Sequence, residues 1–122
     1  MSATTITDIG TVGIPVSDQD KALEFFTGTL GFAKQLDIQM PAMRWLTVLP
    51  TGAATSIALI TGPAPGVDTG IRFLVPDAEA EYTSLKERGV DVGELLRWPG
   101  TPAMFEFKDP DGNKFVAIES AG

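Results

Sequence analysis

Carboxylates are the main candidates for acid–base chemistry in this chain, because the sequence contains no histidine and no cysteine. Catalytic pairs of serine or cysteine with histidine are therefore excluded, as are metal sites built on imidazole or thiolate ligands. Glu106 is the candidate general acid or base, since it interrupts the apolar segment 104–107. The alternative is that Glu106 is an ordinary outward-facing residue of a strand.

Arg72 is the most specific candidate for contact with a ligand. It lies in the apolar segment 70–75, where a guanidinium could hold a carboxylate, a phenolate or a carbonyl oxygen. A buried guanidinium needs a partner. The alternative is therefore a salt bridge from Arg72 to a nearby acid such as Glu106.

Two turn regions, residues 40–45 and residues 98–104, carry aromatic and thioether side chains. Such side chains could enclose a flat or irregular organic molecule. The alternative for each of them is a place in a dimer interface or a cap over the core. The candidates for ligand binding in these regions are Met43, Arg44, Trp45, Trp98 and Met104.

An internal repeat organises the elements that would position these residues. Each copy reads as a strand, an aspartate suited to capping a helix, an amphipathic helix and a glycine suited to a left-handed stop. The two aspartates, Asp18 and Asp77, are 59 positions apart. The two glycines, Gly31 and Gly89, are 58 positions apart. This spacing is typical of two diverged copies of one unit.

Three further strands follow each helix, so the order is βαβββ twice, in an α+β fold. We expect these strands at 33–39, 44–49 and 56–60 in the first copy and at 90–97, 104–108 and 114–119 in the second. The chain of 122 residues is long enough for one domain with a hydrophobic core. We expect a single domain, 1–122, with modules at about 6–61 and 70–119 and a linker rich in proline and glycine at 62–69.

The chain resembles the vicinal oxygen chelate superfamily, which includes glyoxalase I, bleomycin-resistance proteins and extradiol dioxygenases. The resemblance lies in four segments, in order and on the expected elements: residues 16–18, 22–26, 30–32 and 109–113. It implies that each module is a curled four-stranded mixed sheet with one outer helix, and that a ligand lies on the concave face. Small members of this family usually dimerise to complete two clefts, so the resemblance implies a homodimer.

Alternation of side chains along a strand assigns the two faces of each sheet. In the first strand, three apolar residues should face the helix: Val12, Ile14 and Val16. In the fifth strand, the corresponding residues are Ile71, Phe73 and Val75. Thr11, Gly70 and Arg72 are then left for the cleft.

The chain departs from the family at the metal site. Metal-dependent members place a histidine on the first strand, a second ligand on the fifth and a glutamate on the eighth, often with a carboxylate on the fourth. The matching positions here are Thr11, Gly70 and Val116, and residues 51–61 contain no acid. We therefore expect no metal and no cofactor. Oxygen ligands of the turn 109–113 could hold magnesium or calcium, although hairpin chemistry explains them without an ion.

The net charge of −7 argues against nucleic acid as a partner, because nucleic-acid binding needs a basic surface. No apolar run approaches the roughly 20 residues of a membrane span, and the N-terminus lacks the pattern of a signal peptide. We therefore expect a cytoplasmic protein that does not bind membranes.

Together these features predict a protein that binds a small organic ligand, such as an antibiotic or another secondary metabolite, without turning it over. One alternative is an enzyme of the same superfamily, of lyase, isomerase or dioxygenase-like type, that works without the usual histidine and glutamate ligands. Another is an assembly or regulatory subunit whose cleft stays empty.

Overall fold

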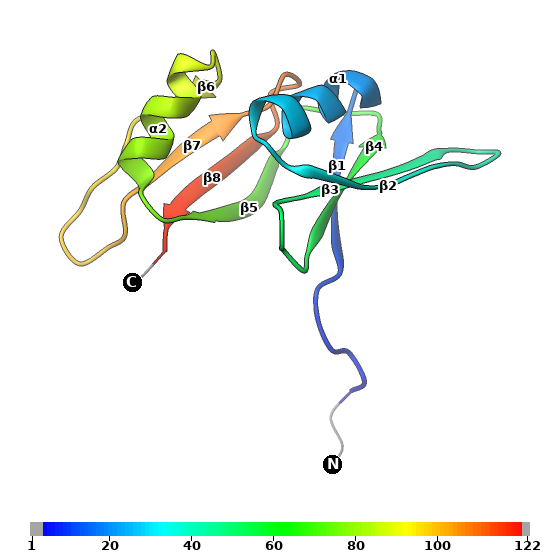
Figure 1. Cartoon of the computed structure of the whole chain (residues 1–122), viewed down its shortest axis with the longest axis horizontal. Helices are drawn as coiled ribbons and strands as arrows, with labels where there is room; N and C mark the ends of the chain where they lie inside the picture. Colours follow the sequence, from blue (N-terminus) through cyan, green and yellow to red (C-terminus); the bar gives the residue numbers. More distant parts are fainter. Residues whose placement is uncertain (1–3, 121–122) are drawn as a thin grey trace.

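The protein forms two similar modules that follow one another along the chain (Figure 1). The computed structural model describes residues 4–120. The first module contains β1 (Thr11–Val16), α1 (Gln19–Glu24), a π-helical turn η1 (Phe25–Thr29), β2 (Ala33–Gln39), β3 (Arg44–Leu49) and β4 (Ser56–Thr61). The second contains β5 (Asp68–Val75), α2 (Ala78–Glu87), β6 (Asp91–Val92), β7 (Met104–Lys108) and β8 (Lys114–Glu119).

Each module folds its four strands into one mixed sheet. The strand order is β1-β4-β3-β2 in the first sheet and β5-β8-β7-β6 in the second. The first strand of each module pairs with the last in parallel, and the other pairs are antiparallel. The predicted α+β fold of two tandem βαβββ modules is therefore confirmed.

The helices begin and end where the sequence predicts. The carboxylate of Asp18 accepts hydrogen bonds from two backbone N–H groups of α1, and Asp77 accepts one from Ala80 of α2. Gly31 and Gly89, with φ of 78° and 82°, adopt the left-handed conformation that suits glycine at a helix end.

The first helix differs from the expected regular α-helix in its last turn. From Phe25 to Thr29 it widens into a π-helical turn, in which the N–H of Leu30 donates to the carbonyl of Phe25. The Thr27 hydroxyl also bonds back to the Leu23 carbonyl, a contact that competes with regular helical bonding. The wider turn places both Phe25 and Phe26 in the core.

The sixth strand is shorter than expected. The sequence predicted a strand over 90–97, but only Asp91–Val92 forms one, and Leu96 makes an isolated bridge to Met104. The chain leaves the sheet at Gly93, whose N–H still donates to the Glu106 carbonyl. Glycine weakens the interior of a strand, which accounts for the early end.

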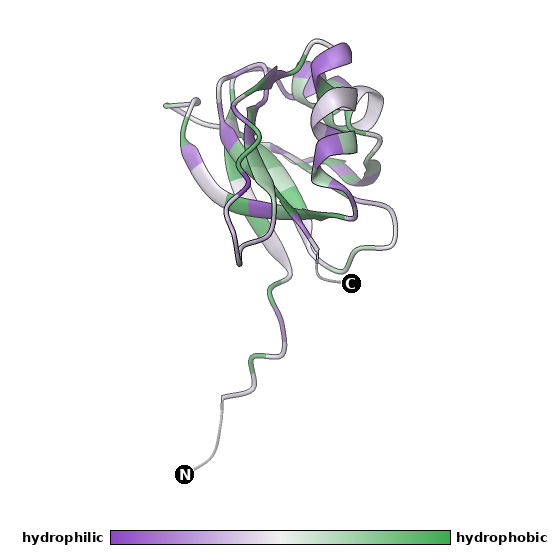
Figure 2. Cartoon of the chain, turned by 90° about the vertical axis from the view of Figure 1, so that its left-hand side faces the viewer, coloured by the Kyte–Doolittle hydropathy of each residue, from purple (hydrophilic) through white to green (hydrophobic). Residues whose placement is uncertain are grey.

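One hydrophobic core joins the two modules on the sides of the sheets that carry the helices. Phe26 lies 5.8 Å from Phe115 between ring centroids, and Phe32 lies 5.5 Å from Phe73. Phe26 and Phe32 belong to the first module and their partners to the second, so the aromatic rings form the joint. Figure 2 shows hydrophobic segments, in green, along the strands.

The predicted faces of the two first strands are confirmed. Ile14 and Val16 are buried in the core, and Val12 is half-buried on the same side. In β5 the half-buried residues that pack against the core are Ile71, Phe73 and Val75. The alternate residues face the other side of each sheet, which carries no helix.

Asn113 connects three separate segments of the chain. Its side-chain N–H groups donate to the Pro15 carbonyl (2.8 Å) and to the Asp109 carboxylate (2.9 Å). Its side-chain oxygen accepts from the N–H groups of Gly66 (2.8 Å) and Val67 (3.0 Å). This fully buried amide therefore ties the end of β1, the linker and the β7–β8 hairpin together.

Within residues 4–120, no helix is both long enough and apolar enough to cross a membrane.

Candidate functional site

The candidate site lies on the sides of the sheets that carry no helix, called here the helix-free faces. Strand pairing and alternation define them. In the first module the face consists of Thr11, Gly13, Pro15, Leu36, Ile38, Trp45, Thr47, Leu49, Ser56, Ala58 and Ile60. In the second it consists of Gly70, Arg72, Leu74, Met104, Glu106, Lys108, Lys114, Val116 and Ile118.

Three of the predicted residues lie on the helix-free face of the second module. Arg72 and Glu106 flank Val116 in one row across three strands, because both residues pair with Val116. The next row consists of Leu74, Ile118 and Met104. The face therefore changes from polar to apolar along the strands, and Arg72 stands near the boundary.

Arg72 has no carboxylate partner among residues 4–120. Its guanidinium donates to the Gly70 carbonyl at 3.0 Å, and the residue is exposed. The alternative salt bridge to Glu106 is not formed. Glu106 instead lies 3.7 Å from Lys114, whose ammonium also lies 3.5 Å from Asp68. Donors of the Arg72 guanidinium are therefore available to a ligand.

Glu106 lacks the surroundings of a catalytic acid. Its side chain is 53% exposed and shares a cation, Lys114, with another carboxylate. Catalytic carboxylates are usually buried or paired so that their pKa approaches the working pH. The position of Glu106 is that of an outward-facing strand residue.

The helix-free face of the first module has a floor of small residues, with hydroxyl groups and a half-buried indole. Thr11 and Ser56 pair across β1 and β4, and their hydroxyl oxygens are 2.8 Å apart. Thr47 is buried and donates to the Gln35 side-chain oxygen at 3.0 Å. Trp45, on the same face of β3, is half-buried. Such a surface can contact a flat ring while offering hydroxyl groups to its oxygen atoms.

Arg44 lies on the opposite side of its sheet from Trp45. Two of its nitrogens donate to Asp37 at 2.8 and 2.9 Å, and a third donates to Asp20 at 2.8 Å. These hydrogen bonds raise the pKa of Arg44, and the bond from Arg44 lowers the pKa of Asp37. The structure therefore does not bring Arg44 together with Trp45, and its guanidinium serves to fasten α1 to the β2–β3 hairpin.

The remaining predicted residues lie at turns. Met40 and Met43 flank the β2–β3 turn and are 37% and 38% exposed. Trp98 lies in the segment between β6 and β7 and is 57% exposed. Both segments join the second and third strands of their modules, and they leave large apolar side chains exposed.

The residues at the family's metal positions do not fit a transition metal. Thr11 offers a neutral hydroxyl that is bonded to Ser56 of β4, while Gly70 and Val116 offer no ligating side chain. Zinc and similar ions need three or four imidazole, thiolate or carboxylate ligands at one point. Within residues 4–120, no three such residues lie close enough to hold a metal ion.

The turn 109–113 is held by its own hydrogen bonds. The Asp109 carboxylate accepts from the backbone N–H groups of Asp111 and Asn113 and from the Asn113 amide. Burial raises the pKa of the Asp109 carboxyl. The Asp111 carboxylate accepts from Ser17 of the first module. Hairpin chemistry thus accounts for these oxygen atoms without a cation.

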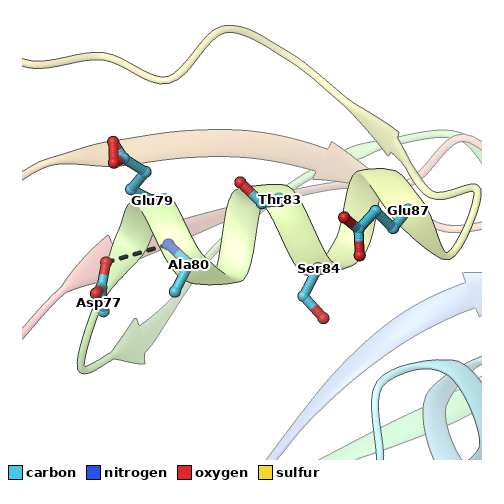
Figure 3. Close-up of a pocket in the computed structure, with 6 residues that line it drawn as sticks. All are labelled: Asp77, Glu79, Ala80, Thr83, Ser84 and Glu87. Atoms are coloured by element: carbon cyan, nitrogen blue, oxygen red, sulfur yellow. Dashed lines mark hydrogen bonds between the residues drawn. The ribbon is translucent and has the colours of Figure 1, made fainter.

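The structure has two hollows. A cavity of about 740 Å³ lies between the modules, and it is lined by helix-side residues such as Phe32, Ile57 and Phe73 and also by Arg72 and Leu74. A second hollow of about 480 Å³ follows the outer surface of α2, and Figure 3 shows three carboxylates around it, from Asp77, Glu79 and Glu87. The carboxylate of Asp77 is already used as the helix cap. This second surface has the character of a solvated helix face.

Comparison with known proteins identifies the family to which this architecture belongs. The sequence profile of the Glyoxalase/Bleomycin resistance protein/Dioxygenase superfamily matches residues 8–117. The chain belongs to this superfamily. The structure of a superfamily member from Sphaerobacter thermophilus DSM 20745 has a TM-score of 0.91 and 40% sequence identity, over 96% of this chain and 100% of that one.

Two further relatives are similar to this chain over nearly their whole length. TnmS3, an antibiotic-binding protein from Streptomyces sp. CB03234, superimposes with a TM-score of 0.88 and 34% identity, over 98% of this chain and 100% of that chain. The Bacillus subtilis (strain 168) protein YetH, which is uncharacterized, is 37% identical over 93% of this chain and 99% of its own length.

Sequence reasoning missed two features of the site. Ser56 was not among the candidates, although its parallel pairing with Thr11 follows from the βαβββ order. The inter-module cavity could not be foreseen, because it depends on how the two sheets pack. The predicted contacts of Arg72, Trp45 and Thr11 with a ligand stay predictions.

Proposed function

We propose that this protein binds a small organic ligand, an antibiotic or another secondary metabolite, on its helix-free faces and without the family's metal. The observation that carries the proposal is that Thr11, at the position of a metal ligand in the family, offers a neutral hydroxyl that is bonded to Ser56 of the neighbouring strand. The resemblance to TnmS3, which binds an antibiotic, supports the same class of ligand.

The chemistry of the faces favours a flat, oxygen-bearing molecule. Arg72 would donate charge-assisted hydrogen bonds to a carboxylate, phenolate or carbonyl oxygen. The Trp45 ring would stack on an aromatic or otherwise flat part. Apolar residues such as Ile118 and Leu74 would cover the rest of the molecule. Ligand pockets are commonly built in this way, with mostly apolar walls and a few polar groups that fix orientation.

A second copy of the chain would complete the site. Leu36, Ile38 and Leu74 on the helix-free faces are 42%, 47% and 73% exposed. Contiguous exposed apolar side chains mark interaction surfaces. A homodimer that opposes these faces would turn two open surfaces into clefts, as the expected dimer requires.

Binding without turnover fits the positions of the reactive groups. Glu106 is exposed and paired with Lys114, and the faces carry no imidazole or thiolate. A ligand would therefore be held and released unchanged.

Calorimetric titration with a panel of aromatic antibiotics tests the proposal. Arg72→Gln should weaken binding by roughly 10- to 100-fold, because a hydrogen bond to a charged group contributes about 1.5–3 kcal/mol. Arg97→Gln is the matched control, since Arg97 pairs with Glu79 on the exposed surface. Equal affinities of the two variants, or no binding by any compound of the panel, would count against the proposal.

A further inference from the structure

One side chain of β2, that of Gln35, falls outside the regular pairing of the first sheet. The register of β2 against β3 shifts at this residue: Lys34 pairs with Val48, and Leu36 pairs with Thr47. Gln35 is therefore the extra residue of a β-bulge. A bulge changes the direction of a side chain locally, and bulges are over-represented next to active sites.

The bulge turns Gln35 onto the helix-free face. Its side-chain oxygen accepts a hydrogen bond of 3.0 Å from the hydroxyl of Thr47, which lies on that face of β3. The residues before and after Thr47, Leu46 and Val48, belong to the core on the opposite side of the sheet. Thr47 is buried but Gln35 is exposed, so the amide of Gln35 is accessible to a molecule bound on this face.

The hydrogen bonds of Thr47 fix which end of the Gln35 amide points toward such a molecule. The Thr47 oxygen accepts from the backbone N–H of Leu36 at 3.1 Å. Because Thr47 is only 1% exposed, its single proton is satisfied by donation to Gln35, and only the amide oxygen can accept it. The amide nitrogen, with its two N–H groups, then has no partner among residues 4–120.

The surroundings of this amide favour an uncharged acceptor. The helix-free face of the first module, as defined above within the described residues, contains no charged side chain. The charged residues of β2 and β3, which are Lys34, Asp37 and Arg44, form ion pairs on the helix side. A charged group of a ligand would lose its hydration here without gaining an opposite charge, which is costly. A neutral carbonyl oxygen loses less, and the N–H groups of Gln35 can replace its water.

We propose that Gln35 determines which ligands bind, by donating from its amide N–H groups to a ketone or amide carbonyl of a flat molecule on the helix-free face of the first module. This role rests on the proposed function and narrows its ligands to ring systems that carry an uncharged oxygen acceptor. Trp45 and Thr47 are two residues apart on one face of β3, a separation of roughly 7 Å. A ring system stacked on Trp45 can therefore bring its own carbonyl to Gln35.

Two compounds that differ at one carbon test this role. Fluorenone-2-carboxylate has a ring carbonyl where fluorene-2-carboxylate has a methylene group, and the flat ring system and the carboxylate are common to both. In calorimetric titrations the wild type should bind the ketone roughly 5- to 10-fold more tightly, because only the ketone gains a hydrogen bond from Gln35. Gln35→Glu can still accept the Thr47 proton but has no N–H to donate, so it should lose this preference. Gln39→Glu adds the same charge to the opposite face of the same strand and should keep it.

Variants of Thr47 separate selection by Gln35 from a purely structural role. Thr47→Val removes the proton that fixes the amide, and the preference for the ketone should fall toward equal affinity. Thr47→Ser retains the proton and should retain the preference; if Thr47→Val does not fold, the Gln35→Glu result decides. Equal affinity of the wild type for the two compounds, or a preference that survives Gln35→Glu, would overturn the role of Gln35 and leave the proposed function standing. Binding of neither compound by the wild type would count against both.

Discussion

Replacing Asn113 with alanine should destabilise the protein more than any surface substitution. The amide makes four hydrogen bonds, to Pro15, Gly66, Val67 and Asp109, and it is fully buried. At about 1 kcal/mol for each bond, the loss is about 4 kcal/mol. This is a large part of the roughly 5–15 kcal/mol by which a domain is stable.

Urea unfolding, followed by circular dichroism, measures this effect. With a slope of roughly 2 kcal/mol per molar urea, the midpoint of Asn113→Ala should fall by about 2 M. Gln39→Ala is the matched control, because the Gln39 amide also bonds to backbone carbonyls but is exposed. A loss below about 1 kcal/mol, or one equal to that of the control, would refute the idea that Asn113 fastens β1, the linker and the hairpin together.

Three other experiments probe separate parts of the structure. The difference in free energy of unfolding between the wild type and Asp109→Asn should become smaller as pH rises above 3.8, the ordinary pKa of the Asp109 carboxyl. The reason is that burial raises the pKa of Asp109, so the native state favours the protonated carboxyl. The wild type therefore loses stability as this carboxyl ionises with increasing pH. A difference in stability that grows with pH would contradict a raised pKa of Asp109. Arg44→Met should cost about 1 kcal/mol in urea unfolding but leave ligand affinity within about 3-fold, because the Arg44 ion pairs lie on the helix side and are partly exposed; a large loss of affinity would place Arg44 in the site after all. Trp45→Phe should abolish most of the fluorescence change caused by ligand while Trp98→Phe keeps most of it, and the reverse pattern would move the ligand to the β6–β7 segment.

Most of the fold could be predicted from the sequence, because the strongest patterns in the sequence are local. An aspartate before each helix and a glycine after it define the same unit twice, and alternation fixes the faces of β1 and β5. The β2–β3 hairpin was harder to interpret. Residues 46–49 are apolar or small on both faces, and a register shift between Lys34 and Leu36 changes which residues of β2 share a side.

The site was predicted less completely, because it depends on contacts between distant segments. Arg44 and Trp45 were both predicted to contact the ligand because they are adjacent in sequence. Adjacent residues of a strand face opposite sides of the sheet. In addition, the Arg44 guanidinium donates hydrogen bonds to Asp20 and Asp37. Asn113 was interpreted as a turn residue, which is correct locally. Its bond to Pro15 spans 98 positions of the chain, and no local pattern predicts it.

The most direct test of the central claim is a fluorescence titration with a bound antibiotic, carried out with and without a strong chelator. The account predicts saturable binding to the untagged protein with the same affinity in both conditions, and no change of the ligand's mass after release. Binding that disappears with the chelator and returns with one equivalent of a single divalent metal would contradict it, because the Thr11–Ser56 pair, Gly70 and Val116 could not then be the residues at the site.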